Sequence, residues 1–162
     1  MSIPQEVVKL FESPPLWAFA GTRDRELAPA VHLAWGIHVA PDRLHVDALI
    51  PAPHALRLRE NLADNGWLAI TVTDPVHHET YQLKGHVTEV RAPSAAERAM
   101  QAEASLAKLA YFTAHNLLPP HLIAALEGFH LAPSTFVRLR VEECFVQTPG
   151  PTAGKPLPME AS

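Results

Sequence analysis

The sequence predicts a mainly β domain of the α+β class: an antiparallel barrel of six strands with peripheral helices. Six β-rich runs follow one another through short connections, and two helical patterns lie between the fifth and the sixth run. Strands and helices do not alternate, as they would in a parallel sheet. With 16 prolines and 7 glycines in 162 residues, the chain divides into short elements rather than long helices.

Each predicted element begins and ends at turn or capping residues. The strands are predicted over 16–20, 26–39, 43–50, 67–73, 80–90 and 135–147. Four helices are predicted. The first is short and ends before Pro14, and the others lie over 54–64, from Ser94 to about Phe112, and from Pro119-Pro120 to Gly128. Ser2 with Gln5, and Ser94 with Glu97, have the spacing of capping boxes. The alanine-rich helix after Ser94 is expected to pack its Met100, Leu106 and Leu109 side against the barrel.

The run 26–39 has the clearest two-residue period in the chain. Its odd positions are bulky and apolar, from Leu27 to Val39, whereas its even positions from Ala28 to Gly36 are small around one polar residue, His32. We therefore expect the odd positions to face the core. The flat even face suits either another protein surface or a planar ligand.

Composition excludes several classes of protein. The hydrophobic fraction of 48% and charged fraction of 19% are typical of one globular domain. We assign it to residues 1–148, with a helical insertion at about 94–128 and a Pro/Gly-rich tail, of disorder-like composition, over 149–162. The net charge of −4 argues against nucleic-acid binding. No apolar run suits a membrane span and the first residues do not resemble a signal peptide, so a cytoplasmic protein is expected.

No motif for metal binding or nucleophilic catalysis is present. The ten histidines have no ligand-like spacing, so no metal site is expected. There is no nucleophile elbow and no glycine-rich phosphate loop. The single cysteine, Cys144, stands in an apolar strand and is expected to be buried and unreactive.

Two arginines, Arg57 and Arg59, stand near the start of the helix predicted after the third strand. Guanidinium groups close to the free N–H groups of a helix terminus suit a phosphate. The alternative is a solvated helix face on which the arginines pair in part with Glu60. The sequence leaves both interpretations open.

The segment from Pro4 to Val90 resembles the FMN-binding split-barrel proteins related to pyridoxamine 5′-phosphate oxidase. The resemblance lies in the order of its elements, which read PPLWAFAGT, ELAPAVHLAWGIHV, RLHVDALI, PHALRLRENLADNGWLAITVTDP and YQLKGHVTEV. The most specific part is the RENLADN helix with the β run after it, followed by Q-x-x-G. The tail, FVQTPGPTAGKPLP, resembles a subgroup that we associate with no settled activity.

The resemblance implies FMN bound between two subunits of a homodimer. It assigns the phosphate to His32 and Arg57, with Arg59 nearby, and a place beside the flavin ring to Gln82. Leu58 stands where the family often has a lysine. Further residues are expected beside the flavin ring, on the small face and edge of the strand 26–39 and at the end of the next strand. Their backbone groups would bind the carbonyls and nitrogens of the flavin, and they are Ala34, Trp35, Leu49 and Ile50.

The function that follows is that of an FMN-dependent oxidoreductase with an unidentified small-molecule substrate and electron donor. The flavin would carry the electron chemistry and the protein would position it, so no catalytic acid or base is named. The alternatives are a non-catalytic flavin-binding or stress protein, a deazaflavin binder, a haem-binding split barrel, and an empty site.

Overall fold

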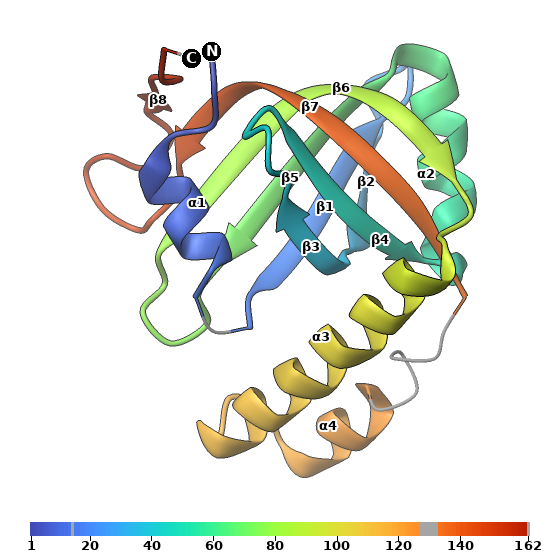
Figure 1. Ribbon diagram of the computed structural model, residues 1–162, viewed down its shortest axis with the longest axis vertical. Helices are drawn as coiled ribbons and strands as arrows, with labels where there is room; N and C mark the ends of the chain where they lie inside the picture. The colour runs from blue at the N-terminus through green and yellow to red at the C-terminus, as the bar shows by residue number, and fades with distance from the viewer. Residues whose placement is uncertain (14, 127–132, 162) are drawn as a thin grey trace.

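A computed structural model describes residues 1–13, 15–126 and 133–161. In these residues one curled antiparallel sheet is surrounded by helices (Figure 1). The elements in chain order are α1 (Gln5–Phe11), β1 (Trp17–Arg23), β2 (Pro29–Leu33), β3 (Trp35–Val39), β4 (His45–Pro51), α2 (Ala52–Asn65), β5 (Trp67–Thr73), β6 (Thr80–Arg91), α3 (Ala95–Ala114), α4 (Pro120–Leu126), β7 (Ser134–Val146) and β8 (Pro156–Leu157). The predicted mainly β, α+β architecture is confirmed.

The sheet curls because its two outer strands are consecutive in the chain. Its order is β2-β1-β5-β6-β7-β4-β3, with the short β8 beside β7. A single buried residue, Ala34, joins β2 to β3, and its amide donates a hydrogen bond to the carbonyl of Ala18 in β1 (3.0 Å). The chain thus crosses from one end of the sheet order to the other within one residue. The predicted count of six strands is therefore slightly wrong, because the run 26–39 forms two strands.

This break reverses which side chains point inward. In β2 the even position His32 is 3% exposed, whereas the odd positions Leu27, before the strand, and Val31 are each 66% exposed. In β3 the odd positions Ile37 and Val39 pack against the core, as predicted. The expectation of one core face along the whole run is wrong for β2, since each strand has its own orientation.

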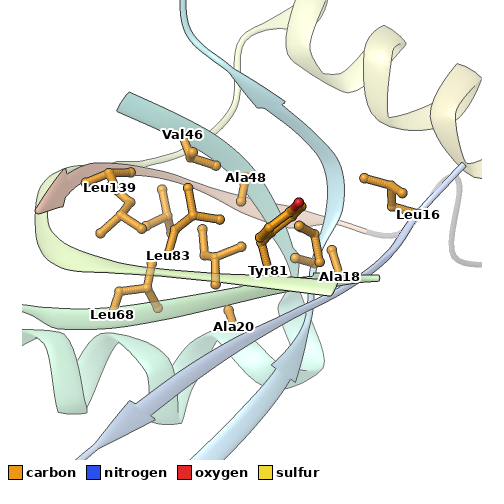
Figure 2. Close-up of a cluster of buried hydrophobic side chains, with 14 of the residues drawn as sticks. Leu16, Ala18, Ala20, Val46, Ala48, Leu68, Tyr81, Leu83 and Leu139 are labelled. Carbon is orange, nitrogen blue, oxygen red and sulfur yellow. The ribbon is translucent and has the colours of Figure 1, made fainter. Parts of the chain in front are cut away.

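The core lies inside the curl and is closed by two helices. Its side chains come from β1, β4, β5, β6 and β7 (Figure 2). Helix α1 adds Val7 and Leu10, and α2 adds Leu58 and Leu62. Figure 1 shows these two helices on opposite sides of the curled sheet. Leu58, the position where the related family often has lysine, is thus a fully buried core residue.

The helix termini agree in part with the predictions. Helix α2 begins at Ala52, two residues earlier than expected, because proline fits the first turn, and Gly66 caps its C-terminus with φ +72°. The Ser94–Glu97 capping box is confirmed. The Ser2–Gln5 box is wrong, because Pro4 caps α1 without a side-chain bond. The predicted end of α4 at Gly128 lies outside the described residues.

The buried face of α3 differs from the predicted one. It consists of Gln101, Ser105, Lys108, Leu109 and Phe112. Met100 and Leu106 are 42% and 54% exposed, so of the three predicted residues only Leu109 packs inward. This face lies close to β3, since a Cβ on Gly36 would lie 3.4 Å from the Cα of Gln101. The small face of β3 is therefore covered by the protein's own helix.

Packing alone explains the glycine of the Q-x-x-G motif. Gly85 lies at a bulge where β6 crosses closely over β7. A Cβ at this position would collide with the carbonyl oxygen of Arg140. This glycine permits the tight curl of the two longest strands and needs no ligand to account for it.

The Pro/Gly-rich tail returns to the body of the domain. Leu157 of β8 pairs with Cys144 of β7, and Glu160 forms an isolated bridge with Ser2. The Glu160 carboxylate also accepts a hydrogen bond from Arg43 (2.5 Å). The first and last described segments therefore lie side by side (Figure 1).

Among the described residues, no helix has the combined length and apolar character that crossing a membrane requires.

One ion pair crosses the sheet beneath α3. Arg138 of β7 donates two hydrogen bonds of 2.7 Å to the Asp47 carboxylate of β4, and His38 Nε2 lies 3.4 Å from it. Burial opposes ionisation of Asp47, but the bonds from Arg138 and His38 outweigh it and lower its pKa. The bond to Asp47 is the main cause that raises the pKa of His38.

We predict that Arg138→Met lowers the free energy of unfolding by about 2 kcal/mol at neutral pH, because Asp47 then remains buried without its main partner. Urea denaturation measures this. A folded-state pKa below the unfolded value stabilises the protein above pH ~4, so the difference should shrink as the pH falls below that value. Arg140→Met, an exposed arginine two residues along β7, is the control. An equal loss in both variants would contradict the assignment.

Cys144 is 2% exposed, with its Sγ 3.5 Å from the Sδ of Met159, so the predicted burial is confirmed. Burial raises the pKa of its thiol to about 12. We predict that a thiol reagent labels native protein at neutral pH far more slowly than urea-unfolded protein. Mass spectrometry of timed samples measures the two rates, and similar rates would refute the prediction.

Candidate functional site

A groove of about 360 Å³ lies on the outer face of β1, β5 and β6. Small residues, Gly21 and Ala69, form part of its floor, and a Cβ on Gly21 would lie 3.9 Å from the Cβ of Ala69. Trp67, Gln82 and Lys84 supply an aromatic ring, an amide and a cation. The Gln82 amide donates to Thr71 Oγ1 (3.1 Å), which fixes its orientation. The groove therefore offers a flat apolar surface with polar groups at its side.

Lys84 has an aromatic neighbour of its own. Its Nζ lies 4.5 Å from the ring centroid of Phe145 in β7. The His86 ring packs against Trp67, with ring centroids 4.4 Å apart. These two ring contacts restrict the Lys84 and Trp67 side chains and involve no hydrogen bond of either side chain.

Arginines gather where β1 ends, beside the groove. Arg23 lines the groove, and the next residue, Asp24, accepts a hydrogen bond from Arg57 of α2 (2.9 Å). Arg25 pairs with Asp64 of the same helix (3.2 Å). The Arg57 side chain is 53% exposed and that of Arg25 is 81% exposed. Two of the three cations are thus held by carboxylates yet open to solvent.

The turn that carries Asp24 is ordered by that residue. Its Oδ1 accepts the backbone N–H groups of Glu26 and Ala28. Leu27 in this turn has φ +66°, a left-handed conformation that leucine rarely adopts. The Asp24 carboxylate therefore couples the shape of the β1–β2 turn to the position of Arg57.

His32 lies inside the protein rather than on a surface that a phosphate could reach. Its Nε2 is 3.2 Å from Thr22 Oγ1, which also accepts a hydrogen bond from Asn61 of α2 (2.9 Å). All three side chains are buried. In this chain, His32 joins β1, β2 and α2.

The residues expected beside the flavin ring are also interior. Ala34, Trp35, Leu49 and Ile50 are each at most 2% exposed. Leu49 pairs with Trp35 on one side and Phe136 on the other, so its strand has no free edge there. These four residues lie together around β3 and β4, whereas Gln82 lies on β6, beyond β4 and β7 in the sheet order.

Arg57 and Arg59 project from different sides of α2. Arg59 Nη2 donates to Thr135 of β7 (3.2 Å), and Arg59 lines a separate hollow with Val87 and Glu89. The first amide of the helix, that of Ala52, donates to the carbonyl of Pro133. Of the eight residues predicted for the site, Gln82 lines the groove and Arg57 lies beside it.

Seven of the residues that line the groove escaped the sequence reasoning: Gly21, Thr22, Arg23, Trp67, Leu68, Ala69 and Lys84. The alternation of strand 67–73 could have indicated its part of the groove. Its even positions are buried, and its odd positions, which include the small Ala69, are half-buried. Only the pairing of β5 with β1 and β6, however, places Ala69 opposite Gly21 and Lys84.

Apolar side chains border the groove on its β2 side. Val31 pairs with Gly21 across β1 and β2, and Phe19 pairs with Leu33. Val31 is 66% and Phe19 is 38% exposed. Such neighbouring exposed apolar residues are typical of an interaction surface.

In the part of the chain that the structure describes, no three metal-binding side chains cluster.

Solved structures share this fold across nearly the whole chain. HupZ of Group A Streptococcus superposes with a TM-score of 0.55 at 18% identity, covering 94% of this chain and 99% of its own. A protein from Lactobacillus delbrueckii described as a candidate pyridoxamine 5′-phosphate oxidase gives 0.54 at 17% identity, covering 90% and 94%. An F420 reductase gives 0.51 at 13%, covering 88% and 98%. No family model and no curated protein matches the sequence.

These similarities define the class to which the fold belongs. The chain has the split-barrel fold of pyridoxamine 5′-phosphate oxidase-like proteins, so the resemblance noted in the sequence is confirmed at the level of the fold. At these identities the likeness concerns the fold alone.

Proposed function

We propose that this protein binds FMN in the groove of β1, β5 and β6, as a homodimer. The observation that carries the proposal is the groove itself, which joins a floor of Gly21 and Ala69 to an oriented amide, Gln82. A planar isoalloxazine needs a flat apolar floor and a few polar groups at its edge. Both are present within one hollow.

The phosphate end of the ligand is assigned to the arginines at the end of β1. Arg23 lines the groove, and Arg57 donates a hydrogen bond to the residue after it, Asp24. A guanidinium can hold a phosphate through two parallel hydrogen bonds. Arg59 is left out of the site, because it faces Thr135.

We predict that Arg57→Ala weakens FMN binding about 10- to 150-fold, the loss expected for one charge-assisted hydrogen bond. Quenching of flavin fluorescence during titration of the apo-protein measures it. Arg59→Ala, on the other side of the same helix, should bind FMN like the wild type. Riboflavin lacks the phosphate, so its affinity should be equal in wild type and Arg57→Ala.

Three results would count against this site. A loss confined to Arg59→Ala would move the phosphate to the opposite side of α2. An equal loss of riboflavin and FMN affinity in Arg57→Ala would show that the arginine maintains the turn at Asp24 rather than contacting the phosphate. Absence of FMN binding by the wild type would reject the flavin function.

The surface next to the groove supports the proposal of a dimer. The groove is open, and the exposed Val31 borders it opposite Gly21. A second copy packed on Val31 and Phe19 would exclude water from both the apolar side chains and the ligand.

We predict that the protein has twice its chain mass of 17.7 kDa in light scattering, and that Val31→Glu shifts it toward the monomer and weakens FMN binding. A charge placed in an apolar interface costs its desolvation. Val90→Glu, at a valine that is 40% exposed on β6 away from the groove, should stay dimeric. A monomeric wild type at micromolar concentration would overturn the dimer.

The chemistry proposed for the bound flavin is electron transfer between a reductant and a small-molecule substrate. Oxidation of NADH or NADPH by the FMN-loaded protein with an added acceptor distinguishes an oxidoreductase from a non-catalytic flavin-binding protein. The same titration with F420 tests the deazaflavin alternative, since one structural neighbour is named an F420 reductase. A Soret band on adding haemin, lost on replacing one histidine, would favour the haem alternative.

A further inference from the structure

A second hollow, of about 320 Å³, lies between α3 and the start of β1. Its walls come from the end of α1, the start of β1, β3 and α3. Phe11, Leu16 and Ile37 give it an apolar lining, and Ala104 keeps the helix side small. Lys108 is the only charged residue that lines it among the described residues. None of its lining residues belongs to the groove of β1, β5 and β6.

Lys108 is the unusual feature of this hollow. The residue is 5% exposed, and its Nζ lies 4.4 Å from the ring centroid of Trp35 and 5.9 Å from that of Trp17. It forms no hydrogen bond or ion pair with any residue that the structure describes. Burial lowers the pKa of Lys108 to about 8. The group is therefore still largely protonated at neutral pH, against two indole rings.

A buried ammonium without a counter-charge is costly. Charged groups in protein interiors are ordinarily paired or neutralised. The ring faces compensate in part, since a cation is attracted to the electron-rich face of tryptophan. A methionine of similar length would fill the same space without the cost, and such replacements of buried charges are often neutral or stabilising. Among the residues that the structure describes, none supplies a counter-charge to Lys108, and the hollow beside it has space for a bound anion.

We propose that this hollow binds a small organic carboxylate with an apolar or aromatic body, whose carboxylate pairs with the Lys108 ammonium. The apolar walls at Phe11, Leu16 and Ile37 take the body of the ligand. One negative charge matches the single lysine, whereas a phosphate dianion would bring an unbalanced charge into the site. The hydroxyl of Ser13, the other polar side chain there, already donates to the carbonyl of Lys9 (2.9 Å).

The test uses the full-length protein and two pairs of probes. Phenylacetate and octanoate carry the charge, and phenylacetamide and octanamide have matching bodies without it. Calorimetry measures binding, and quenching of tryptophan fluorescence gives a second readout. We expect both carboxylates to bind at least about tenfold more tightly than their amides. Phenyl phosphate tests the dianion.

Lys108→Met removes the charge but keeps the length of the side chain, and it should weaken carboxylate binding about 10- to 100-fold. Lys155→Met, at an exposed lysine of the tail, is the matched control and should bind like the wild type. A circular dichroism spectrum shows that each variant is folded.

The pH dependence of the wild type tests the proposal without any variant. Binding requires the ammonium, so the affinity should be constant below the pKa of free Lys108, about 8, and should fall up to about tenfold per pH unit above it. The proposal is overturned if neither carboxylate binds at millimolar concentration, if the amides bind as tightly as the carboxylates, or if phenyl phosphate binds more tightly than phenylacetate. It is also overturned if Lys108→Met binds the carboxylates as tightly as the wild type, or if the wild-type affinity does not change with pH across this range. None of these results depends on whether the protein binds FMN.

Discussion

The hydrogen bond from the amide of Ala34 to the carbonyl of Ala18 marks the constraint on which the fold depends. It holds the point where the chain leaves β2 and enters β3, the two ends of the sheet order. Because one residue joins these ends, the sheet must curl, and the inside of the curl becomes the core (Figure 2). Ala34 is 1% exposed, so a larger side chain would push the two edges apart.

Strand β1 connects this core with both candidate sites. Its even positions, Ala18, Ala20 and Thr22, point inward and are buried. Its odd positions face outward: Gly21 contributes to the groove, while Trp17 lies against Phe112 of α3, with ring centroids 4.7 Å apart. A single alternating strand therefore places the flat groove near one end and the hollow of Lys108 near the other.

Helix α2 links the interior to the charged end of the groove. Asn61 holds the Thr22–His32 pair from inside, while Arg57, one turn earlier, reaches Asp24 at the surface. The spacing of four residues puts both side chains on the same helix face. The position of His32 on a strand and of Arg57 on a helix could be predicted from the sequence, but their exposure could not: the histidine is buried beside Thr22, and the arginine remains accessible.

The sequence by itself determined the element types, the order of strands and helices, the second capping box, the burial of Cys144 and the resemblance to the split barrel, because all of these follow from local periodicity, turn residues and motif order. The family resemblance also led to Gln82 and Arg57 as candidate site residues, which remain predictions. Only the tertiary structure decided the break at Ala34, the inward turn of His32, the buried face of α3 and the pairing that brings Gly21, Ala69 and Lys84 together. These depend on contacts between segments far apart in the chain, and no local pattern specifies which neighbour will cover a given face.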